Sequence, residues 1–426
     1  MPERFLVRGG RPLSGSIRPA GNKNAALPIL AATLLADGPV ELSNIPHIRD
    51  VEAMLALLSH LGATFEWLGP NRVRVDTKAA QSRPLDPELC ARIRASILLA
   101  GPLLARFGKV QLPPPGGDVI GRRRIDTHVL ALEQLGAQVE VGDRYEIEGR
   151  RLKGCDIFLD EPSVTGTENA LMAAVMAEGR TVLRNAASEP HVQDLARTLV
   201  AMGAEIDGIG TNTYVIHGGR PLKGASYEIG PDHIEIGSFI GLAAVTHSAL
   251  RIANCRPAEH GMTRIMFNRL GVDWRVDGDD IVVPEDQLLA VVDDHGHAVP
   301  KIDDAPWPGF PADLISIATV IATQARGAVL IHEKLYESRL FFVDRLIAMG
   351  ARIVLCDPHR AVVIGPSPLY GQAMVSPDIR AGMALLIAAL CAEGESVIDN
   401  VHQIDRGYER IEDRLLALGA DVRRAT

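Results

Sequence analysis

The sequence predicts an α/β protein built from six copies of one structural unit, arranged as two domains of three units each. A short phrase, seen as LSHLGAT and LIAMGAR, recurs along the 426-residue chain, with a spacing of about 70 residues that is too long for the common solenoid repeats. Each phrase ends a stretch with apolar residues at three- and four-residue steps, so each copy contains an amphipathic helix with glycine as its stop. Six copies of this length cannot share one core of ordinary size, which favours two domains. The six stop glycines are Gly62, Gly136, Gly203, Gly271, Gly350 and Gly419.

A far more apolar helix precedes each amphipathic one, and a helix that is apolar on all sides is normally buried. A glycine- or serine-containing turn and a β-type strand follow each buried helix, as in GPVELSN and GAVLIHE. Alternating strands follow the amphipathic helices, such as RVRVD near Val73 and TYVIHG near Val215. The unit therefore runs strand, buried helix, strand, amphipathic helix, strand, strand. The buried helices are expected over residues 24–35, 89–104, 168–177, 234–245, 314–323 and 381–391.

Polar residues gather at the N-terminal ends of these buried helices, where free N–H groups and the helix dipole attract anions. Asparagine, serine, threonine and aspartate at such positions are explained by ordinary capping, and Asn22, Ser163, Thr165 and Asp378 are all suitable caps. Capping does not explain Lys23, Arg94 and Arg380, because cations at a helix start oppose the dipole. Their recurrence at one position of the repeat favours a shared anion-binding role.

Composition excludes several classes of function. The formal net charge of −9 and the aromatic content of 4% argue against a nucleic-acid binder held by bulk charge or by base stacking. The N-terminus has no apolar signal region, and no apolar run is long enough to span a bilayer, so we expect a cytoplasmic protein without a membrane partner. Five scattered cysteines without CxxC spacing suggest neither a disulfide framework nor a metal site.

One connection is enlarged relative to its counterparts in the other units. The segment 113–128, PPPGGDVIGRRRIDTH, places Asp118 beside a glycine pair and next to a run of three arginines. This pattern suits a lid that closes over an anionic substrate. It also suits a plain hairpin loop with solvated arginines, and the segment by itself leaves both readings open.

Five motifs taken together resemble the UDP-N-acetylglucosamine enolpyruvyl transferase family. They are PAGNKNAALPIL, PPGGDVIGRRRIDTH, SVTGTENALMAAVMAEG, NAASEPHVQDLA and HQIDRGYERIEDRLLALGAD, and the resemblance covers essentially the whole chain. It implies a two-domain inside-out α/β barrel of six βαβαββ repeats, three per domain around a pseudo-threefold axis. The implied domains are 22–230, with a catalytic loop at 113–128, and 1–21 joined with 231–426. Gly230-Pro231 is also a plausible crossing point from its turn chemistry alone.

The resemblance further implies transfer of the carboxyvinyl group of phosphoenolpyruvate to the 3′-hydroxyl of UDP-N-acetylglucosamine, with release of phosphate and no metal or organic cofactor. In the family this reaction is the first committed step of peptidoglycan synthesis. Addition across the vinyl group needs a proton donor and a proton acceptor, which the resemblance assigns to Asp118 and Asp313, with Lys23 as the third catalytic residue. The residues implied to bind phosphoenolpyruvate are Lys23, Asn24, Arg123, Arg380 and Arg406. Those implied to bind the UDP-sugar are Asn24, Arg94, Arg123, Arg124, Ile125, Asp126, Thr127, Ser163, Val164, Asp313 and Leu335.

The chain departs from the family pattern at the acid position, where most members carry cysteine and this chain has Asp118. Fosfomycin alkylates that cysteine as a thiolate, so the departure predicts insensitivity to the drug. Other departures are Arg124 for proline, Glu161 for lysine, His233 for arginine, Ile315 for glutamine and Ser338 for asparagine. They leave open a paralogous enolpyruvyl transferase that acts on a different nucleotide or nucleotide sugar.

Three further alternatives fit less well. The shikimate-pathway relative is disfavoured because its own signatures are absent from the chain. An RNA 3′-terminal phosphate cyclase is disfavoured by the acidic net charge and the scarcity of aromatic residues. A non-catalytic repeat scaffold would not require Lys23, Asp118, Asp313 and Arg406 to coexist.

Overall fold

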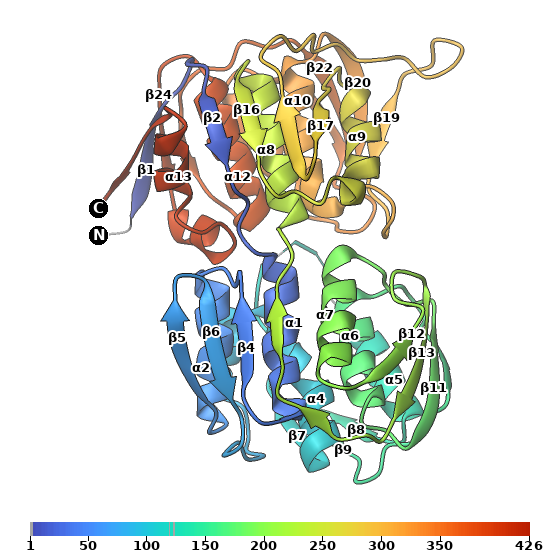
Figure 1. The fold of residues 1–426 in the computed structure, drawn as a ribbon. Coiled ribbons are helices and arrows are strands. Elements are labelled where there is room, and N and C mark those ends of the chain that lie inside the picture. The colour runs from blue at the N-terminus through green and yellow to red at the C-terminus, as the bar shows by residue number, and fades with distance from the viewer. Residues whose placement is uncertain (1–2, 119, 122–123) are drawn as a thin grey trace. The chain divides into compact units, whose positions relative to one another are not determined.

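The computed structural model describes residues 3–118, 120–121 and 124–426, and the chain separates into two compact units. Unit 1 contains residues 3–20, 120–121 and 231–426, and unit 2 contains residues 21–118 and 124–230. The chain therefore passes between the units after Ala20 and again after Gly230. Arg123, which the sequence assigns to both substrates, lies outside the described residues. Figure 1 shows the two units and the elements of each.

In unit 2, three buried helical segments pack together and amphipathic helices and sheets surround them. The buried segments are α1 (Lys23–Ala32) with η1 (Thr33–Leu35), η2 (Arg94–Leu99) with α4 (Ala100–Phe107), and α6 (Val164–Ala174). The amphipathic helices are α2 (Arg49–His60), α5 (Asp126–Gln134) and α7 (Pro190–Ala201). Their apolar faces join one core with the buried segments.

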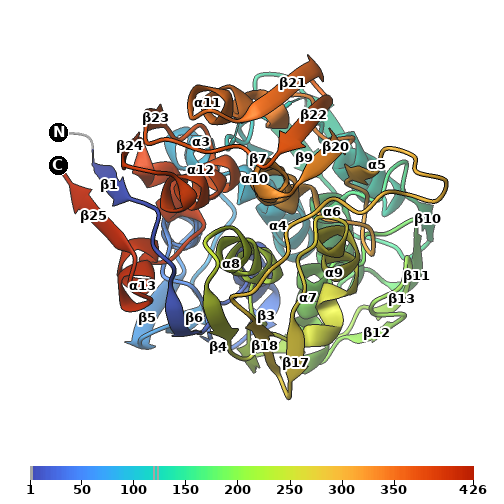
Figure 2. The same cartoon turned by 90° about the horizontal axis from the view of Figure 1, so that it is seen from above.

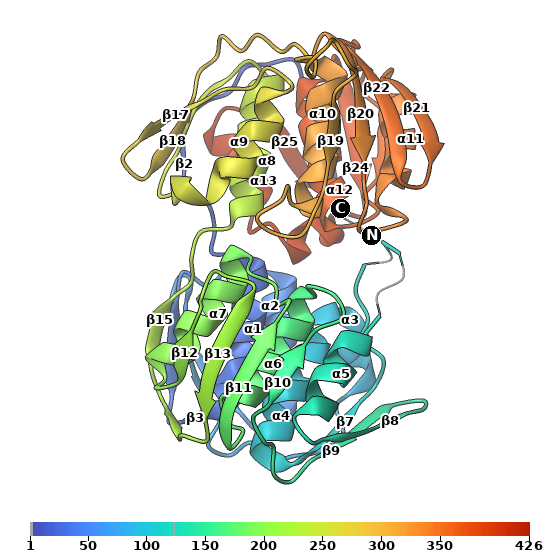
Figure 3. The same cartoon turned by 90° about the vertical axis from the view of Figure 1, so that its right-hand side faces the viewer.

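The sheets of unit 2 are short and mostly antiparallel. One has the order β15 (Ser226–Glu228), β4 (Val40–Ser43), β6 (Arg72–Asp76), β5 (Thr64–Gly69). A second has the order β7 (Lys109–Leu112), β9 (Tyr145–Glu148), β8 (Gln138–Val141). The third, visible in Figure 3, has the order β10 (Asp156–Phe158), β11 (Gly179–Arg184), β13 (Thr213–Gly218), β12 (Glu205–Asp207). A small parallel pair joins β3 (Ala36–Asp37) to β14 (Leu222–Lys223).

Unit 1 repeats the arrangement. Its buried helices are α8 (His233–Val245), η4 (Ala312–Leu314) with α10 (Ile315–Gln324), and α12 (Ile379–Cys391). Figure 2 shows α8, α10 and α12 side by side in the interior of this unit, and each contacts the other two. The outer helices are α9 (Gly261–Asn268) after η3 (Pro257–His260), α11 (Val343–Ala348) after η5 (Arg339–Phe342), and α13 (Ile411–Ala417) after η6 (Val401–Arg406).

Three four-stranded sheets enclose the helices of unit 1. Their orders are β17 (Arg275–Asp277), β18 (Asp280–Val283), β16 (Ala249–Ile252), β2 (Ser14–Ile17); β19 (Lys301–Asp303), β20 (Gly327–His332), β22 (Arg360–Gly365), β21 (Arg352–Asp357); and β23 (Ala373–Val375), β24 (Glu395–Asp399), β1 (Arg4–Arg8), β25 (Asp421–Ala425). With helices inside and sheets outside, each unit is an inside-out α/β barrel of three repeats.

Two strands belong to a different unit from the helix that follows them in the chain. β2 leads directly into α1 of unit 2, yet it pairs in parallel with β16 of unit 1. β15 leads into α8 of unit 1, yet it pairs in parallel with β4 of unit 2. The crossings after Ala20 and Gly230 follow from this exchange, because each unit supplies the leading strand of a repeat in the other.

The predicted buried helix at 89–104 is wrong as a single element. The chain forms α3 (Pro87–Arg92), is extended at Ile93 with φ −136° and ψ 137°, and resumes at Arg94. Because Ile93 is buried and extended, the helix restarts with Arg94 as its first residue. The six stop glycines all have positive φ, as the C-terminal stop requires. Within the described residues, no helix is long and apolar enough to cross a membrane.

Candidate active site

Lys23 lies at the first position of α1 in unit 2 and is nearly buried. Its Nζ is 2.8 Å from Oδ2 of Asp50 in the first turn of α2, and their side chains are 10% and 4% exposed. The cap residue Asn22 accepts a hydrogen bond from the Asn24 amide, as predicted, and Asn24 is half-buried beside it. The lysine that capping could not explain is therefore stabilised by a carboxylate from the neighbouring helix. Sequence reasoning missed Asp50, although an acid in the first turn of an amphipathic helix was a visible signal.

Arg94 begins η2, and its guanidinium reaches the segment that follows the enlarged loop. Its Nη2 donates to the carbonyl oxygen of Arg124 at 3.2 Å. The glycine pair of the loop packs against the same region: a Cβ on Gly116 would lie 1.8 Å from the Ala91 oxygen, and one on Gly117 would lie 2.8 Å from the Arg94 Cβ. These positions require glycine, since no other residue fits so close to the 91–94 backbone.

The residues implied to bind the nucleotide sugar cluster at the start of two adjacent helices. Arg124 contacts Asp126 through an ion pair, Ile125 precedes α5, and Thr127 donates to Asp160 at 2.7 Å. Ser163 caps α6 by accepting from the Gly166 amide, and Val164 is the first residue of that helix. The closeness of the two helix starts is fixed by Gly166, where a Cβ would lie 2.9 Å from a methyl of Thr127.

Thr165 does not cap α6 as predicted, because Ser163 already occupies the cap. The Thr165 hydroxyl instead lies 3.0 Å from Nε2 of His128. Nδ1 of the same histidine is 2.8 Å from the side-chain nitrogen Nδ2 of Asn169. Burial lowers the pKa of His128 to about 3, and the nearby Arg94 charge acts in the same direction. His128 is therefore neutral, and it connects α5 to α6 through hydrogen bonds.

In unit 1, Asp313 lies between two arginines that are almost completely buried. Arg339 Nη2 donates to its Oδ1 and Arg380 Nε donates to its Oδ2, both at 2.9 Å. The Asp313 side chain is 26% exposed, whereas the arginine side chains are 5% and 6% exposed. Asp378 caps α12 by accepting from the amides of Arg380 and Ala381. Asp313 therefore shares its charge between two guanidinium groups, and Asp378 and Asp232 also act on Arg339 and Arg380 respectively.

Electrostatic attraction to Asp313 keeps Arg380 positively charged although it is buried. Burial opposes the charged form of Arg380, but the Asp313 carboxylate outweighs it and holds the pKa of the guanidinium well above its ordinary value. Arg380 also lies 5.5 Å over the ring of Tyr408. Its Nη1 is buried and has no hydrogen-bond partner among the described residues. Sequence reasoning missed Arg339, which lies one residue beyond the departure noted at Ser338.

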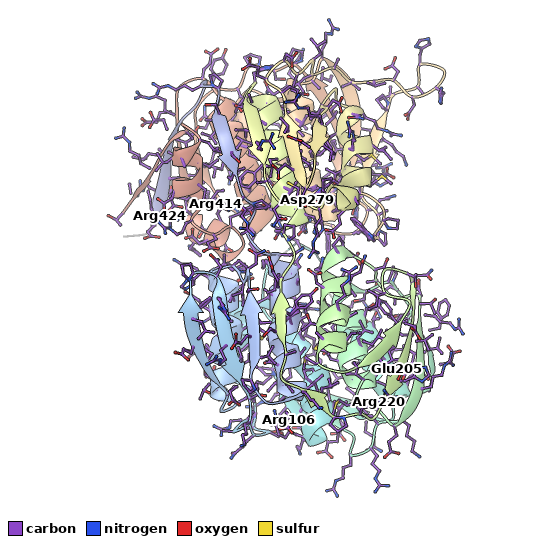
Figure 4. The ribbon with its side chains drawn as sticks, in the orientation of Figure 1. Arg106, Glu205, Arg220, Asp279, Arg414 and Arg424 are labelled. Atoms are coloured by element: carbon purple, nitrogen blue, oxygen red, sulfur yellow. The ribbon has the colours of Figure 1, made fainter. Side chains whose placement is uncertain are left out.

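Arg406 and Leu335 occupy separate places in unit 1. Arg406 ends η6, and its Nη1 donates to Oε1 of Gln403 at 2.9 Å. Arg424, labelled in Figure 4, fixes this segment by donating both Nη atoms to Asp405, at 2.9 Å and 2.7 Å. Leu335 is 45% exposed on the turn between β20 and η5. Asp118 is half-buried in unit 2.

His233, which stands where the family usually has arginine, is buried at the start of α8. Its ring meets Trp307 edge-on, with centroids 6.0 Å apart. Burial lowers its pKa to about 3, and the charges of His260 and Arg380 act in the same direction. A neutral imidazole therefore occupies a position where a cation was expected from the family pattern.

Comparisons with known proteins agree with this geometry. Residues 7–415 match the model of the EPSP synthase (3-phosphoshikimate 1-carboxyvinyltransferase) family. The chain is 63% identical over 423 residues to a UDP-N-acetylglucosamine 1-carboxyvinyltransferase of Bradyrhizobium diazoefficiens, covering 99% of this chain and 98% of that one. It is 55% identical over 418 residues to the protein of the same name from Treponema denticola, covering 98% of each chain.

Solved structures give the same fold. The enolpyruvyl transferase NikO from Streptomyces tendae is similar with a TM-score of 0.88 at 26% identity, covering 100% of this chain and 99% of that one. The EPSP synthase from Acinetobacter baumannii matches with a TM-score of 0.75 at 18% identity, covering 100% of both chains, which shows the fold alone. The family match, the repeat architecture and the identity of more than half of all residues lead to one conclusion: the chain belongs to the EPSP synthase family and, within it, to the UDP-N-acetylglucosamine 1-carboxyvinyltransferases.

Proposed function

We propose that this protein transfers the enolpyruvyl group of phosphoenolpyruvate to the 3′-hydroxyl of UDP-N-acetylglucosamine and releases phosphate, the first committed step of peptidoglycan synthesis. The observation that carries the proposal is the Asp313 cluster. A partly exposed carboxylate held by two buried guanidinium groups, one with a buried donor left over, combines a proton acceptor with a place for an anion. Relatives with more than half of their residues identical carry the name of this activity.

The reaction asks two different tasks of these residues. The sugar 3′-oxygen must lose its proton as it attacks C2 of phosphoenolpyruvate, and C3 must gain a proton in the same addition. We assign proton removal to Asp313, because two guanidinium groups keep its carboxylate ionised. We assign proton donation to Asp118. The resulting phospholactyl ketal then collapses: the C2–O bond to phosphate breaks, C3 loses a proton, and the vinyl group re-forms on the sugar oxygen.

The cations bind the phosphoenolpyruvate carboxylate and phosphate, which carry the substrate's negative charge. We assign this role to Lys23, Arg123, Arg380 and Arg406, with Asn24 at the junction with the sugar. Preorganised cations also stabilise the charge that develops on the departing phosphate. Arg94, the segment 124–127, Ser163, Val164 and Leu335 are assigned to the UDP-sugar. We infer a cytoplasmic location, since both substrates are intracellular metabolites.

A second candidate is transfer to a different nucleotide or nucleotide sugar. Two observations favour keeping it: the 26% identical enolpyruvyl transferase NikO shares the fold across its whole length, and neutral His233 replaces the expected cation. Arg124 and Ile315 add further departures near residues assigned to the sugar.

A phosphate-release assay with phosphoenolpyruvate and a panel of UDP-sugars and nucleotides separates these candidates. Release with UDP-N-acetylglucosamine, together with a product heavier by one enolpyruvyl group, supports the main proposal. Release only with another acceptor supports the second candidate. If no acceptor supports release, both assignments are wrong and only the fold remains. Asp313→Asn serves as the matched control, because asparagine keeps the shape of the side chain but cannot accept the proton.

A further inference from the structure

The turn that leads from β20 to Arg339 is held by two fully buried carboxyl groups that the assigned reaction does not use. Asp304 accepts from the amides of Lys334 at 2.5 Å and Leu335 at 3.2 Å. Glu333 accepts from the amide of Tyr336 at 3.1 Å. Both acids are 0% exposed. Three consecutive backbone N–H groups are thus held by two side chains, which gives the turn a defined conformation.

The two carboxyl groups are hydrogen-bonded to each other. Burial raises the pKa of Glu333 to about 9, and the Asp304 charge and hydrogen bond act in the same direction, although Arg339 opposes them. Glu333 is therefore protonated at neutral pH, because its carboxyl group is buried beside Asp304.

Arg339 connects this pair to Asp313. Its Nε lies 3.9 Å from Oε2 of Glu333, and neither atom has a hydrogen-bond partner among the described residues. Its Cζ lies 5.0 Å over the ring of Tyr336, and its Nη2 holds Asp313 at 2.9 Å. If Glu333 were ionised, it would compete with Asp313 for the guanidinium charge. As a neutral acid, it packs against the guanidinium and leaves that charge directed at Asp313.

We propose that Asp304 and Glu333 form a buried carboxyl pair that positions Arg339 and, through it, the assigned proton acceptor Asp313. The proposal rests on the proposed function for its kinetic consequences. Neither acid touches the reacting atoms, so both are positioning residues. The pair keeps the turn in place with backbone hydrogen bonds and keeps a second negative charge away from Arg339.

The sharpest test compares two replacements of Glu333. Glu333→Gln keeps a neutral group that donates to Asp304 and accepts from the Tyr336 amide, so its kcat should stay within about threefold of wild type. Glu333→Leu removes both hydrogen bonds at similar volume and lets the turn shift. Because a displacement of about 1 Å costs roughly 100-fold in rate, we expect kcat to fall by that order while KM for both substrates changes little.

A titration of Asp313 without substrate gives a readout that a merely structural role would not move. Among the described residues, the groups that face Asp313 include Arg339 of η5, Arg380 of α12 and His233 of α8. In Glu333→Leu the carboxylate loses part of the Arg339 interaction and binds protons more readily. Its ¹³C carboxyl titration, assigned with Asp313→Asn, should move to higher pH, and the acid limb of kcat should move with it. In Glu333→Gln neither should move.

The outcomes separate the inference from the proposed function. If the wild-type protein releases no phosphate with any acceptor, the proposed function is wrong. The Asp313 titration would still test whether Asp304 and Glu333 position Arg339. Unchanged titration and kcat in a folded Glu333→Leu variant overturn the inference, as does a Glu333→Gln variant as impaired as Glu333→Leu. If Glu333→Leu does not fold, Asp304→Asn replaces it, since its amide N–H opposes a backbone N–H and should give the same titration shift.

Discussion

The two units place a buried ion pair at the same position of the repeat, but the balance of charge differs. At the start of α1 in unit 2, Lys23 meets the carboxylate of Asp50. At the starts of α10 and α12 in unit 1, one carboxylate, Asp313, meets both Arg339 and Arg380. The repeat therefore determines where charged side chains gather, and the individual residues determine how the charges pair. Unit 1 holds a partly exposed carboxylate between two buried guanidinium groups, whereas unit 2 pairs one amine with one buried carboxylate.

The largest effect should come from Asp313, because this partly exposed carboxylate pairs with two buried arginines, Arg339 and Arg380. Asp313→Asn removes the proposed proton acceptor, and general-base contributions run from about 10² to 10⁴, so kcat for phosphate release should fall by about 10³. Circular dichroism and the melting temperature check that the variant folds. A variant with kcat within about tenfold of wild type would show that another group takes the proton.

Asp118, the proposed proton donor in unit 2, should determine whether fosfomycin inactivates the enzyme. Fosfomycin needs a thiolate nucleophile, and Asp118 supplies a carboxylate, so wild-type activity should survive the drug. Asp118→Cys should retain measurable activity and lose it on incubation, with an inactivation rate at least about 100-fold that of wild type. Mass spectrometry of the treated protein should place the adduct on the new cysteine. Equal inactivation of the two proteins would remove Asp118 from the donor role.

Lys23 tests whether the balanced pair of unit 2 serves stability, binding or both. Lys23→Met leaves the Asp50 carboxylate buried without its amine, which typically costs about 3 kcal/mol of unfolding free energy. The double variant Lys23→Met/Asp50→Leu removes the stranded charge and should recover most of that stability. Its KM for phosphoenolpyruvate should remain raised, because an anion-binding cation is still missing. Recovery of both stability and KM in the double variant would limit Lys23 to a structural role.

Much of this architecture was predictable because repeat patterns are local. Propensities that act within a few residues predict the stop glycines, the buried helices α1 and α12, and the caps Asn22, Ser163 and Asp378. The break at Ile93 was not predictable, since nothing in the local apolar run distinguishes a continuous helix from one interrupted by a tertiary contact. Thr165 was misassigned because two acceptable caps compete and Ser163 takes the position.

The residue types of the candidate site could be predicted from the sequence, but the residues with which they pair could not. A cation at a helix start indicated function at Lys23 and Arg380, but their partners Asp50 and Asp313 come from other helices, and sequence distance carries no signal of that contact. Arg339 was missed for the same reason, since a buried arginine in a short polar stretch looks like a surface residue. The exchange of β2 and β15 between units depends on which parallel partner a strand finds, and each strand is too short to specify one.

The smallest effects should come from the two buried histidines, one in each unit. The pKa values of His128 and His233 are both lowered to about 3, chiefly by burial, against 6.5 for the ordinary side chain. Between those values the unfolded chain binds a proton that the folded protein does not, so the stability present above pH 6.5 is progressively lost as the pH falls toward 3. At pH 5 each histidine should cost about 2 kcal/mol of unfolding free energy relative to pH 7.5.

His128→Gln and His233→Gln separate the contributions of the units. Each glutamine replaces an imidazole that must stay neutral with an amide that does not titrate, so each variant should lose about 2 kcal/mol less than wild type between pH 7.5 and 5. Urea denaturation at both pH values measures this difference, with any constant cost of the substitution cancelling between them. His128 lies in a hydrogen-bonded network with Thr165 and Asn169, whereas His233 faces Arg380 and Asp313. If only His233→Gln flattens the pH dependence, acid sensitivity arises in the charge cluster of unit 1 rather than from burial itself.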